Sequence, residues 1–214
     1  MKIGVLGTGG VGQSLGKAFI ALGHEVKMGG REPNNEKAQA WANEMGSQAS
    51  IGTFADAARF CEVAVLATLG VANEEALNLA GPANFRGKLV LDSTNPLDFS
   101  HGLPPGLAIN GNDSGGERVQ QQLVDAHVVK VFNTVGHELM FQPKLPGGPP
   151  DMFICGNDEG AKARTSKLLK DFGWEVVDLG GIECSRYLEA MCVVWVLSGA
   201  RTNHWNQAFK LLRG

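Results

Sequence analysis

The sequence has little of what marks nucleic-acid-binding or membrane-spanning proteins. Its net charge is −3, and no Lys or Arg cluster exceeds an isolated pair, so it lacks the basic patch of a nucleic-acid binder. The longest strongly apolar run, Met191 to Leu197, is too short to cross a bilayer. The first expected strand begins at Lys2, which leaves no room for a signal peptide. We therefore expect a cytoplasmic protein without nucleic-acid or membrane partners.

Metal-binding spacing is also missing. The four cysteines, Cys61, Cys155, Cys184 and Cys192, stand far apart, with no C-x-x-C pair and no histidine at ligand spacing. We expect no metal site and interpret these residues as buried thiols in a reducing compartment.

Glycine, by contrast, is abundant: it makes up 29 of the 214 residues, about twice its average share. It follows no three-residue period, which excludes a collagen-like chain. Hydrophobic residues (43%) far outnumber charged ones (19%), which argues against disorder. Since a chain of this length can bury enough surface to fold on its own, the composition predicts a globular protein punctuated by glycine.

Apolar runs and helical spacing alternate along most of the chain. The expected strands are residues 2–6, 24–28, 49–51, 63–68, 88–92, 127–132, 152–155 and 174–178. The expected helices are residues 10–22, 36–45, 54–60, 74–80, 117–125 and 159–172. Thr53 and Asp56 have the spacing of a capping box at the start of the third helix. This alternation predicts an α/β fold: a doubly wound, mostly parallel Rossmann sheet with helices on both faces.

Two connections and the C-terminal segment interrupt this pattern. Residues 97–116 carry five glycines and two prolines, which predicts a long loop, and residues 142–150 form a second Pro-Gly connection. Long loops in compact domains are often functional, so we expect both to border a ligand. The residues from Cys184 onward show helical spacing with an interruption near Gly199.

The strongest motif is Gly7-Thr8-Gly9-Gly10-Val11-Gly12, a G-x-G-x-x-G between the first strand and the first helix. In this context Gly7 permits the tight turn, Gly9 lets a pyrophosphate approach the backbone, and Gly12 allows close helix–strand packing. The helix N-terminus adds free N–H groups and partial positive charge. The motif favours a dinucleotide-binding turn over a purely structural glycine turn.

The end of the second strand bears on which dinucleotide is bound. An acidic residue there accepts a hydrogen bond from the ribose 2′-hydroxyl of NAD, whereas the 2′-phosphate of NADP needs positive charge. Here Gly30 leaves room and Arg31 offers a planar donor fork, with Lys37 as a second candidate cation and Thr8 as a candidate hydroxyl donor. We expect NADP. The alternative is that Arg31 only solvates the loop and Glu32 binds the ribose of NAD.

Small polar side chains follow the later strands, where the nicotinamide of a dinucleotide lies in a doubly wound sheet. The candidates are Thr68, Leu69, Gly70, Asn95 and Pro96, and, on the acceptor side, Asn133, Thr134, Val135, Gly136 and His137. Ser, Thr and Asn are also common where a strand passes into a loop. For Asn95 and Thr134 the alternative therefore stays open that they only shape these turns and contact no ligand.

No general acid or base is evident beside these residues. His137 is the one titratable candidate at a strand end, and by spacing it equally begins a short helix over residues 137–141. Tyr187 is the only tyrosine, so the sequence has no Tyr-x-x-x-Lys pair for carbonyl reduction. Hydride transfer between two stacked rings depends on orientation more than on acid–base chemistry, and the catalytic residues stay unassigned.

Together these residues resemble the family of NADPH-dependent oxidoreductases acting on coenzyme F420, whose fold also supplies the cytosolic reductase domain of membrane metalloreductases. The likeness covers nearly the whole chain, and its markers are residues 2–12, 22–26, 29–31, 92–97, 129–134 and 155–158. It implies NADPH along the strand ends, with a deazaflavin stacked on the nicotinamide. By motif, Thr8, Arg31 and Lys37 would hold the 2′-phosphate, and residues 133–136 would lie beside the nicotinamide.

Two departures from the family pattern concern the ligands. Gly30 stands where the family often has serine, which weakens the preference for NADP. Asn133 and Gly136 stand where the F420 enzymes have histidine and proline, so a flavin, a quinone-like ring, a metal chelate or another organic acceptor remains open. Other candidate functions are reduction of a small imine or carbonyl, and a non-enzymatic NADP-binding redox sensor.

We divide the chain into an NADP-binding Rossmann domain, residues 1–141, and a small α/β extension, residues 142–214. The extension ends in an apolar stripe made of Tyr187, Leu188, Met191, Val194, Trp195 and Leu197. Such a stripe is buried against the sheet or against a second subunit, and we expect a homodimer.

Overall fold

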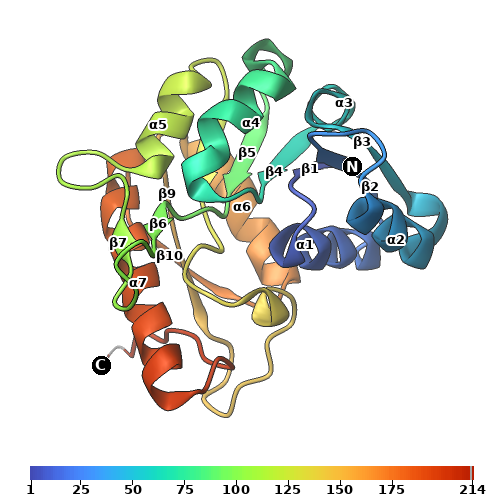
Figure 1. Ribbon diagram of the computed structural model, residues 1–214. Helices are drawn as coiled ribbons and strands as arrows, with labels where there is room; N and C mark the ends of the chain where they lie inside the picture. The colour runs from blue at the N-terminus through green and yellow to red at the C-terminus, as the bar shows by residue number, and fades with distance from the viewer. Residues whose placement is uncertain (213) are drawn as a thin grey trace.

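The computed structural model describes residues 1–212 and 214 and is built around one large sheet (Figure 1). Its strands are β1 (Lys2–Leu6), β2 (Glu25–Gly30), β3 (Ala49–Thr53), β4 (Val63–Leu66), β5 (Leu89–Asp92), β8 (His127–Lys130), β9 (Asp151–Gly156) and β10 (Glu175–Asp178). These eight strands lie in the order β10-β9-β8-β5-β4-β1-β2-β3. The stretch from β3 to β8 has the doubly wound order of the Rossmann fold, which confirms the predicted fold class.

Strand direction changes once within the described sheet. Neighbouring strands from β3 to β8 are parallel, and β8, the predicted sixth parallel strand, pairs with β5 from His127 to Lys130. At the next junction β9 runs antiparallel to β8, with Val129 opposite Gly156, and β10 then pairs parallel to β9. The sheet is therefore mostly parallel, with β9 and β10 added to its edge.

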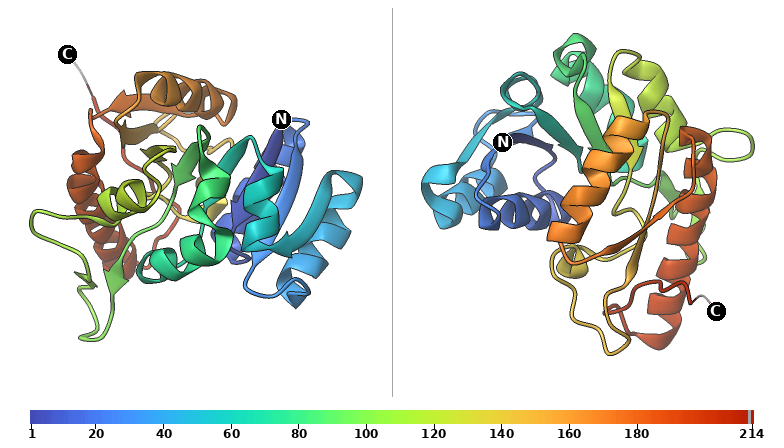
Figure 2. Two further views of the ribbon diagram at one scale, coloured as in Figure 1. Left: turned by 90° about the horizontal axis from the view of Figure 1, so that it is seen from above. Right: turned by 180° about the vertical axis from the view of Figure 1, so that it is seen from behind.

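Helices cover both faces of the sheet (Figure 2). They are α1 (Gly10–Ala21), α2 (Glu36–Met45), α3 (Phe54–Phe60), α4 (Asn73–Ala80), α5 (Gly115–Gln122), α6 (Glu159–Asp171) and α7 (Ser185–Thr202). Short 3-10 turns are η1 (Gly46–Gln48), η2 (Gly70–Ala72), η3 (Pro82–Phe85), η4 (His137–Leu139) and η5 (Ile182–Cys184). The predicted capping box starts α3, because the side chains of Thr53 and Asp56 each accept from the other's backbone N–H.

Two apolar cores follow from the alternation of side chains along the strands. Leu89 and Leu91 of β5 face one core with α1, α2 and α6, whereas Val90 between them faces a second core with α3, α4 and α5. Successive strand residues point to opposite faces, so a continuous apolar strand can fill both cores. With both faces covered, ligand access is left at the carboxyl ends of the strands.

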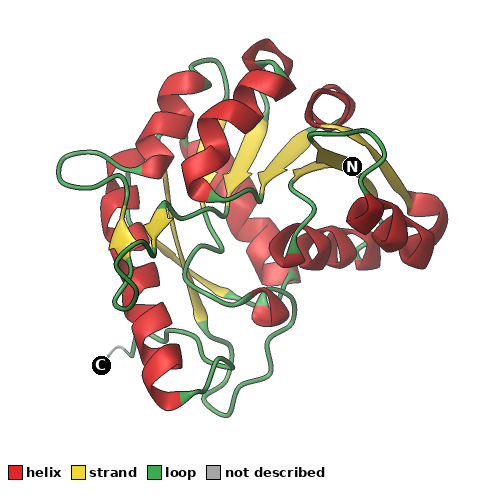
Figure 3. Cartoon of the chain, viewed as in Figure 1, coloured by secondary structure: helices red, strands yellow, loops and turns green. Residues whose placement is uncertain are grey.

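The long loop predicted over residues 97–116 contains more structure than expected (Figure 3). Two short strands, β6 (Leu97–Asp98) and β7 (Gly106–Leu107), pair antiparallel within it. Helix α5 also begins earlier than the predicted Glu117, because Ser114 caps it by accepting from the Glu117 N–H. The helix predicted over residues 137–141 is only the short turn η4.

The C-terminal helix corrects a further expectation. Helix α7 runs through Gly199 without the predicted interruption. Gly199 is needed for packing instead: a Cβ there would lie 2.5 Å from the ring of Trp205, which folds back over the helix. The chain after α7 then returns to the sheet, where the Asp151 N–H donates to the Phe209 carbonyl at 3.0 Å.

The four cysteines are free thiols in the described chain. Cys61, Cys155 and Cys192 are buried as expected, but Cys184 is partly exposed.

Candidate dinucleotide and acceptor site

The glycine turn after β1 has the shape that a phosphate turn requires. Gly7 has φ of 130°, a conformation that L side chains rarely adopt, and a Cβ on it would collide with the Ala67 carbonyl. A Cβ on Gly12 would collide with the Gly7 carbonyl, so Gly12 lets α1 pack closely on the turn. Above Gly9 the space is open: apart from its two chain neighbours, no residue has an atom within 4 Å of a Cβ position. Two glycines thus shape the turn while the third leaves its backbone accessible.

A cavity of about 410 Å³ opens over this turn. It brings together nine of the predicted residues: Gly7, Thr8, Gly9, Gly10, Val11, Gly30, Arg31, Thr68 and Leu69. The other lining residues, which the sequence analysis missed, are Asn35, Phe54, Ala67, Ala72 and Ala76. Asn35 carried a signal, since it caps α2 by accepting from the Ala38 N–H at 3.1 Å and an N-cap position is readable from sequence.

Two residues predicted for the adenosine end differ in position. Arg31 lines the cavity, whereas the exposed Lys37 on α2 is not among its lining residues. Packing does not require glycine at position 30, because a Cβ there would lie at van der Waals distance, 3.4 Å, from Thr8 Cγ2 and from the Glu32 carbonyl. Arg31 is therefore the charged group that the described lining residues offer to a nucleotide.

Arg31 is held by a residue that the sequence analysis missed, Glu75 of α4. Arg31 Nη2 lies 2.9 Å from Glu75 Oε2, and Arg31 Nε lies 3.4 Å from Glu75 Oε1, so the ion pair is bidentate. The hydrogen bond to Glu75 raises the pKa of Arg31 and lowers the pKa of the carboxyl. The spacing of residues 74–80 predicts a helix but does not tell which side chain faces β2.

A chain of hydrogen bonds leads from the cavity into the protein. Thr68 Oγ1 donates to Asn73 Oδ1 at 2.6 Å, and Asn73 Nδ2 donates to Thr94 Oγ1 at 2.7 Å. Thr94 in turn donates through Oγ1 and N to Asp92 Oδ1, at 2.7 and 2.9 Å. These contacts lock the loops after β4 and β5 together at the carboxyl edge of the sheet.

This chain ends at a buried lysine. Lys130 Nζ lies 2.8 Å from Asp92 Oδ2, from Glu189 Oε1 and from the Thr94 carbonyl. Burial alone favours the neutral amine, but the two carboxylates outweigh it and raise the pKa of Lys130 above its usual range. The ammonium thereby joins β5, β8 and α7 below the site.

The residues predicted for the nicotinamide end follow β5 and β8. Asn95 Nδ2 donates to the Asn133 carbonyl at 2.8 Å, and Asn133 Nδ2 donates to Asn95 Oδ1 and to the Leu188 carbonyl, both at 2.9 Å. Asn133 Oδ1 is buried and has no hydrogen-bond partner among the described residues. Such an orphan acceptor is uncommon and calls for an explanation, for example a ligand donor. Phe132, just before it, has φ of 62°, an uncommon value for a residue with a side chain.

The other candidates predicted near the nicotinamide lie in different surroundings. Thr134 is buried, and Val135 belongs to the apolar core beside α1, α2 and α6. Pro96 is buried, and a Cβ on Gly115 at the start of α5 would lie 3.5 Å from its ring. Gly70 lies against Asn95, because a Cβ there would collide with the Asn95 carbonyl.

Gly136 and His137 face different neighbours. A Cβ on Gly136 would lie 3.2 Å from the ring of Trp195, whose centroid is 5.4 Å from that of Trp205. His137 lies instead against α1: a Cβ on Gly10 would be 2.8 Å from its Nε2, and its Nδ1 is 3.2 Å from Ser14 Oγ. His137, a candidate for the acceptor side, is thus placed next to the glycine turn.

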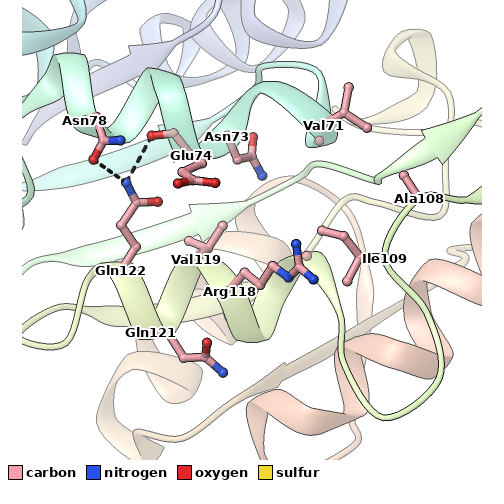
Figure 4. Close-up of a pocket in the computed structure, with 12 residues that line it drawn as sticks. Val71, Asn73, Glu74, Asn78, Ala108, Ile109, Arg118, Val119, Gln121 and Gln122 are labelled. Carbon is pink, nitrogen blue, oxygen red and sulfur yellow. Dashed lines mark hydrogen bonds between the residues drawn. The ribbon is translucent and has the colours of Figure 1, made fainter.

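A second and larger groove, of about 540 Å³, lies between α4 and α5 (Figure 4). Gly70 contributes to this groove and not to the cavity over the turn. Gln122 closes one end by donating to the Glu74 carbonyl at 3.0 Å and to Asn78 Oδ1 at 2.9 Å. The groove lacks the glycine turn and is separated from the cavity by η2.

The described part of the chain has no cluster of three or more His, Cys, Asp or Glu side chains that could hold a metal ion. Its described helices also lack the length and apolar character needed to cross a membrane.

The fold and the glycine turn define the class: a Rossmann-type dinucleotide-binding protein. Comparison with known proteins agrees. Residues 2–96 match the family model of the coenzyme F420-dependent NADP oxidoreductases. A solved structure from Arthrobacter sp. FB24, whose assignment as an F420-dependent NADP reductase is provisional, is 40% identical, with both chains covered in full and a TM-score of 0.94. The chain belongs to this family of NADP-dependent oxidoreductases.

More distant relatives match parts of larger proteins. The metalloreductase STEAP3 of Rattus norvegicus is 25% identical over 194 residues, which are 89% of this chain and 36% of that protein. The chain thus spans about a third of the length of this curated relative. A reductive aminase from Aspergillus terreus, solved with NADPH and ethyl-5-oxohexanoate, is 19% identical with a TM-score of 0.66, over 94% of this chain and 63% of that one. This second likeness shows the fold alone.

Proposed function

We propose that this protein binds NADPH over the Gly7–Gly12 turn and transfers hydride between its nicotinamide and a second ring-shaped acceptor, coenzyme F420 or a flavin. The observation that carries the proposal is the open space above Gly9 between two tightly packed glycines. A pyrophosphate at a helix N-terminus needs this combination of a rigid turn and an accessible backbone. Arg31 at the other end of the cavity supplies a cation for the 2′-phosphate.

The nicotinamide end supports the same proposal. When bound, NADPH supplies the hydride. The N–H group of its carboxamide is the kind of donor that the orphan Oδ1 of Asn133 requires. Asn95 holds the Asn133 side chain in place, and the Asp92–Lys130–Glu189 group holds the strands below. The residues of the chain thus orient a flat ring rather than supply a proton, as hydride transfer between two rings requires.

A ferric chelate is the second candidate acceptor. The likeness to the metalloreductase STEAP3 over most of this chain favours it. A chelated ferric ion would be a substrate that takes one electron. The two electrons of one hydride would therefore reduce two ferric ions through a bound flavin that passes them singly, with the proton released to solvent.

Nucleotide binding tests the first half of the proposal. Titration calorimetry should show that NADP⁺ binds more tightly than NAD⁺. Arg31→Ala should weaken NADP⁺ about ten- to a hundredfold, as expected for loss of hydrogen bonds to a charged group, and leave NAD⁺ nearly unchanged. Glu32→Gln is the matched control, because Glu32 is the carboxylate that an NAD site would use. Tighter NAD⁺ binding that is lost in Glu32→Gln would contradict the assignment.

An acceptor panel tests the second half. NADPH oxidation is followed with coenzyme F420, a flavin, a ferric chelate and small imines or carbonyls. Turnover with F420 or with flavin as the final acceptor supports the proposal, and turnover that needs the ferric chelate together with a catalytic amount of flavin supports the second candidate. Turnover only with an imine or carbonyl, or tight NADPH binding without any turnover, would overturn both.

A further inference from the structure

The Arg31–Glu75 pair joins two walls of the cavity over the glycine turn. Arg31 follows β2, and Glu75 lies on α4 between Ala72 and Ala76, which both line the cavity. The guanidinium and the carboxylate make two contacts, at 2.9 and 3.4 Å. Both side chains are about three-fifths exposed, so a ligand entering the adenosine end can reach them. The pair therefore stands where the 2′ position of a bound adenosine would be read.

The charges at this end are balanced before any nucleotide arrives. Among the described residues that line the cavity, Arg31 is the one charged side chain, and Glu75 already neutralises it. A ribose 2′-phosphate carries between one and two negative charges and needs the same guanidinium fork. It must therefore displace the Glu75 carboxylate or bind beside a like charge, and either event lowers its affinity.

We infer that Glu75 is a specificity-determining residue that moderates the preference for NADP(H) over NAD(H) by competing with the 2′-phosphate for Arg31. The inference rests on the proposed binding of the nucleotide over the Gly7–Gly12 turn. For NAD(H) the same carboxylate acts in the opposite sense, since it is an acceptor for the 2′-hydroxyl of the ribose. Removal of its charge therefore shifts the ratio of the two affinities toward NADP(H): NADP(H) binds more tightly, and NAD(H) binds no more tightly than before.

Glu75→Gln tests the inference with a matched control on the same helix turn. Glu74→Gln removes an equal charge one residue earlier, and Glu74 lines the other groove instead of contacting Arg31. Dissociation constants are measured for NADP⁺, NAD⁺, 2′,5′-ADP and 5′-AMP with both variants and the unmodified protein. Thermal unfolding of both variants checks that they fold.

Glu75→Gln should raise the ratio of the NAD⁺ to the NADP⁺ dissociation constant about two- to fivefold over Glu74→Gln, the upper scale of an exposed ion pair. The same substitution should make 2′,5′-ADP bind more tightly, and 5′-AMP should bind with unchanged or lower affinity. A ratio within twofold of that of Glu74→Gln, or a lower ratio, overturns the inference. Glu75 would then position the Arg31 side chain without competing with the 2′-phosphate. The proposed NADP preference is judged separately, from the unmodified protein, and can fail while Glu75→Gln still shifts the ratio.

Discussion

Lys130 and Glu189 form a buried ion pair, with Nζ 2.8 Å from Oε1, that fastens α7 to the end of β8. The same carboxylate accepts from two backbone N–H groups at the start of α5, those of Gly115 and Gly116, both at 3.0 Å. An anion is favourable at a helix N-terminus, so the helix shares in neutralising Glu189. Asn133, which donates to the α7 carbonyl of Leu188, depends on this attachment for its position.

Loss of the lysine charge should destabilise the whole fold. Lys130→Met leaves Asp92 and Glu189 buried without their cation, which should lower the unfolding free energy by about 3–5 kcal/mol at pH 7. Urea unfolding at pH 7 measures the loss.

Lys17→Met is the control for this substitution. Lys17 Nζ lies 3.7 Å from Glu44 Oε1, and both side chains are 66% exposed. Loss of such a pair should change the unfolding free energy by less than about 0.5 kcal/mol. Equal effects of the two substitutions would contradict the role given to the buried group.

His137 should contribute to binding of either dinucleotide. It lies against Gly10 in the turn shared by NADP and NAD, and not at the adenosine end. His137→Ala should therefore weaken NADP⁺ and NAD⁺ by the same factor, about three- to tenfold for one lost polar contact. Fluorescence or calorimetric titration with both nucleotides measures this. An effect on acceptor turnover alone, with unchanged nucleotide affinity, would return His137 to the acceptor side.

The sequence predicted the parts of this site that depend on local spacing. The turn from Gly7 to Gly12 has a backbone geometry that only its glycines allow, and Arg31 follows directly from the end of β2. Glu75 was not predictable, because the rotation of α4 about its axis is set by packing in the second core. The position of His137 was not predictable for a similar reason: the turn at Phe132, with φ of 62°, is followed by a segment that passes over α1.

The direction of β9 and the packing of the C-terminal tail on α7 could not be predicted from local sequence patterns either. Nothing in the apolar run of β9 distinguishes an antiparallel strand from a parallel one. Gly199 was predicted to interrupt the helix because glycine is a poor helix former. The reason for glycine at this position is instead its contact with the Trp205 ring, which the helical spacing of the sequence does not reveal.

Gly199→Ala should displace the C-terminal tail. Alanine favours the helix by about 1 kcal/mol over glycine, but its Cβ would lie 2.5 Å from the Trp205 ring. Because Trp205 is 46% exposed, the tail should move while α7 stays folded. Limited proteolysis should cleave residues 203–212 faster, and tryptophan emission should shift to the red. Gly147→Ala, where a Cβ meets open space, should change neither signal.

The outer face of α7 is the basis for the predicted homodimer. Leu188 is buried, but Tyr187 and Val194 on the same helix are 67% and 56% exposed. If a second copy covers this face, the double substitution Tyr187→Ser with Val194→Ser should shift sedimentation from dimer to monomer at micromolar concentration. Leu79→Ser on α4, another exposed apolar residue at 51%, should leave sedimentation unchanged. A monomer in the unmodified protein would refute the predicted dimer.

The capping box of α3 should give the protein a measurable sensitivity to acid. Asp56 Oδ2 accepts from the hydroxyl and the backbone N–H of Thr53, at 2.7 and 2.9 Å, and Oδ1 accepts from Arg59 at 2.7 Å. The Thr53 contacts, followed by Arg59, lower the pKa of Asp56 to about 2. A carboxyl with a lowered folded pKa stabilises the fold above its unfolded value, and that stability is lost as the pH falls through the folded value.

Asp56→Asn should therefore cost about 1 kcal/mol of unfolding free energy at pH 7, a cap-sized effect that solvent screening keeps small because the side chain is 42% exposed. The difference from the unmodified protein should persist to about pH 4 and disappear toward pH 2, where both carry a neutral side chain at this position. Urea unfolding across this range measures it. Asp125→Asn, at an exposed pair with Arg86 outside any cap, should cost less at every pH. A difference that stays constant down to pH 2 would mean that the Asp56 charge does not stabilise the cap.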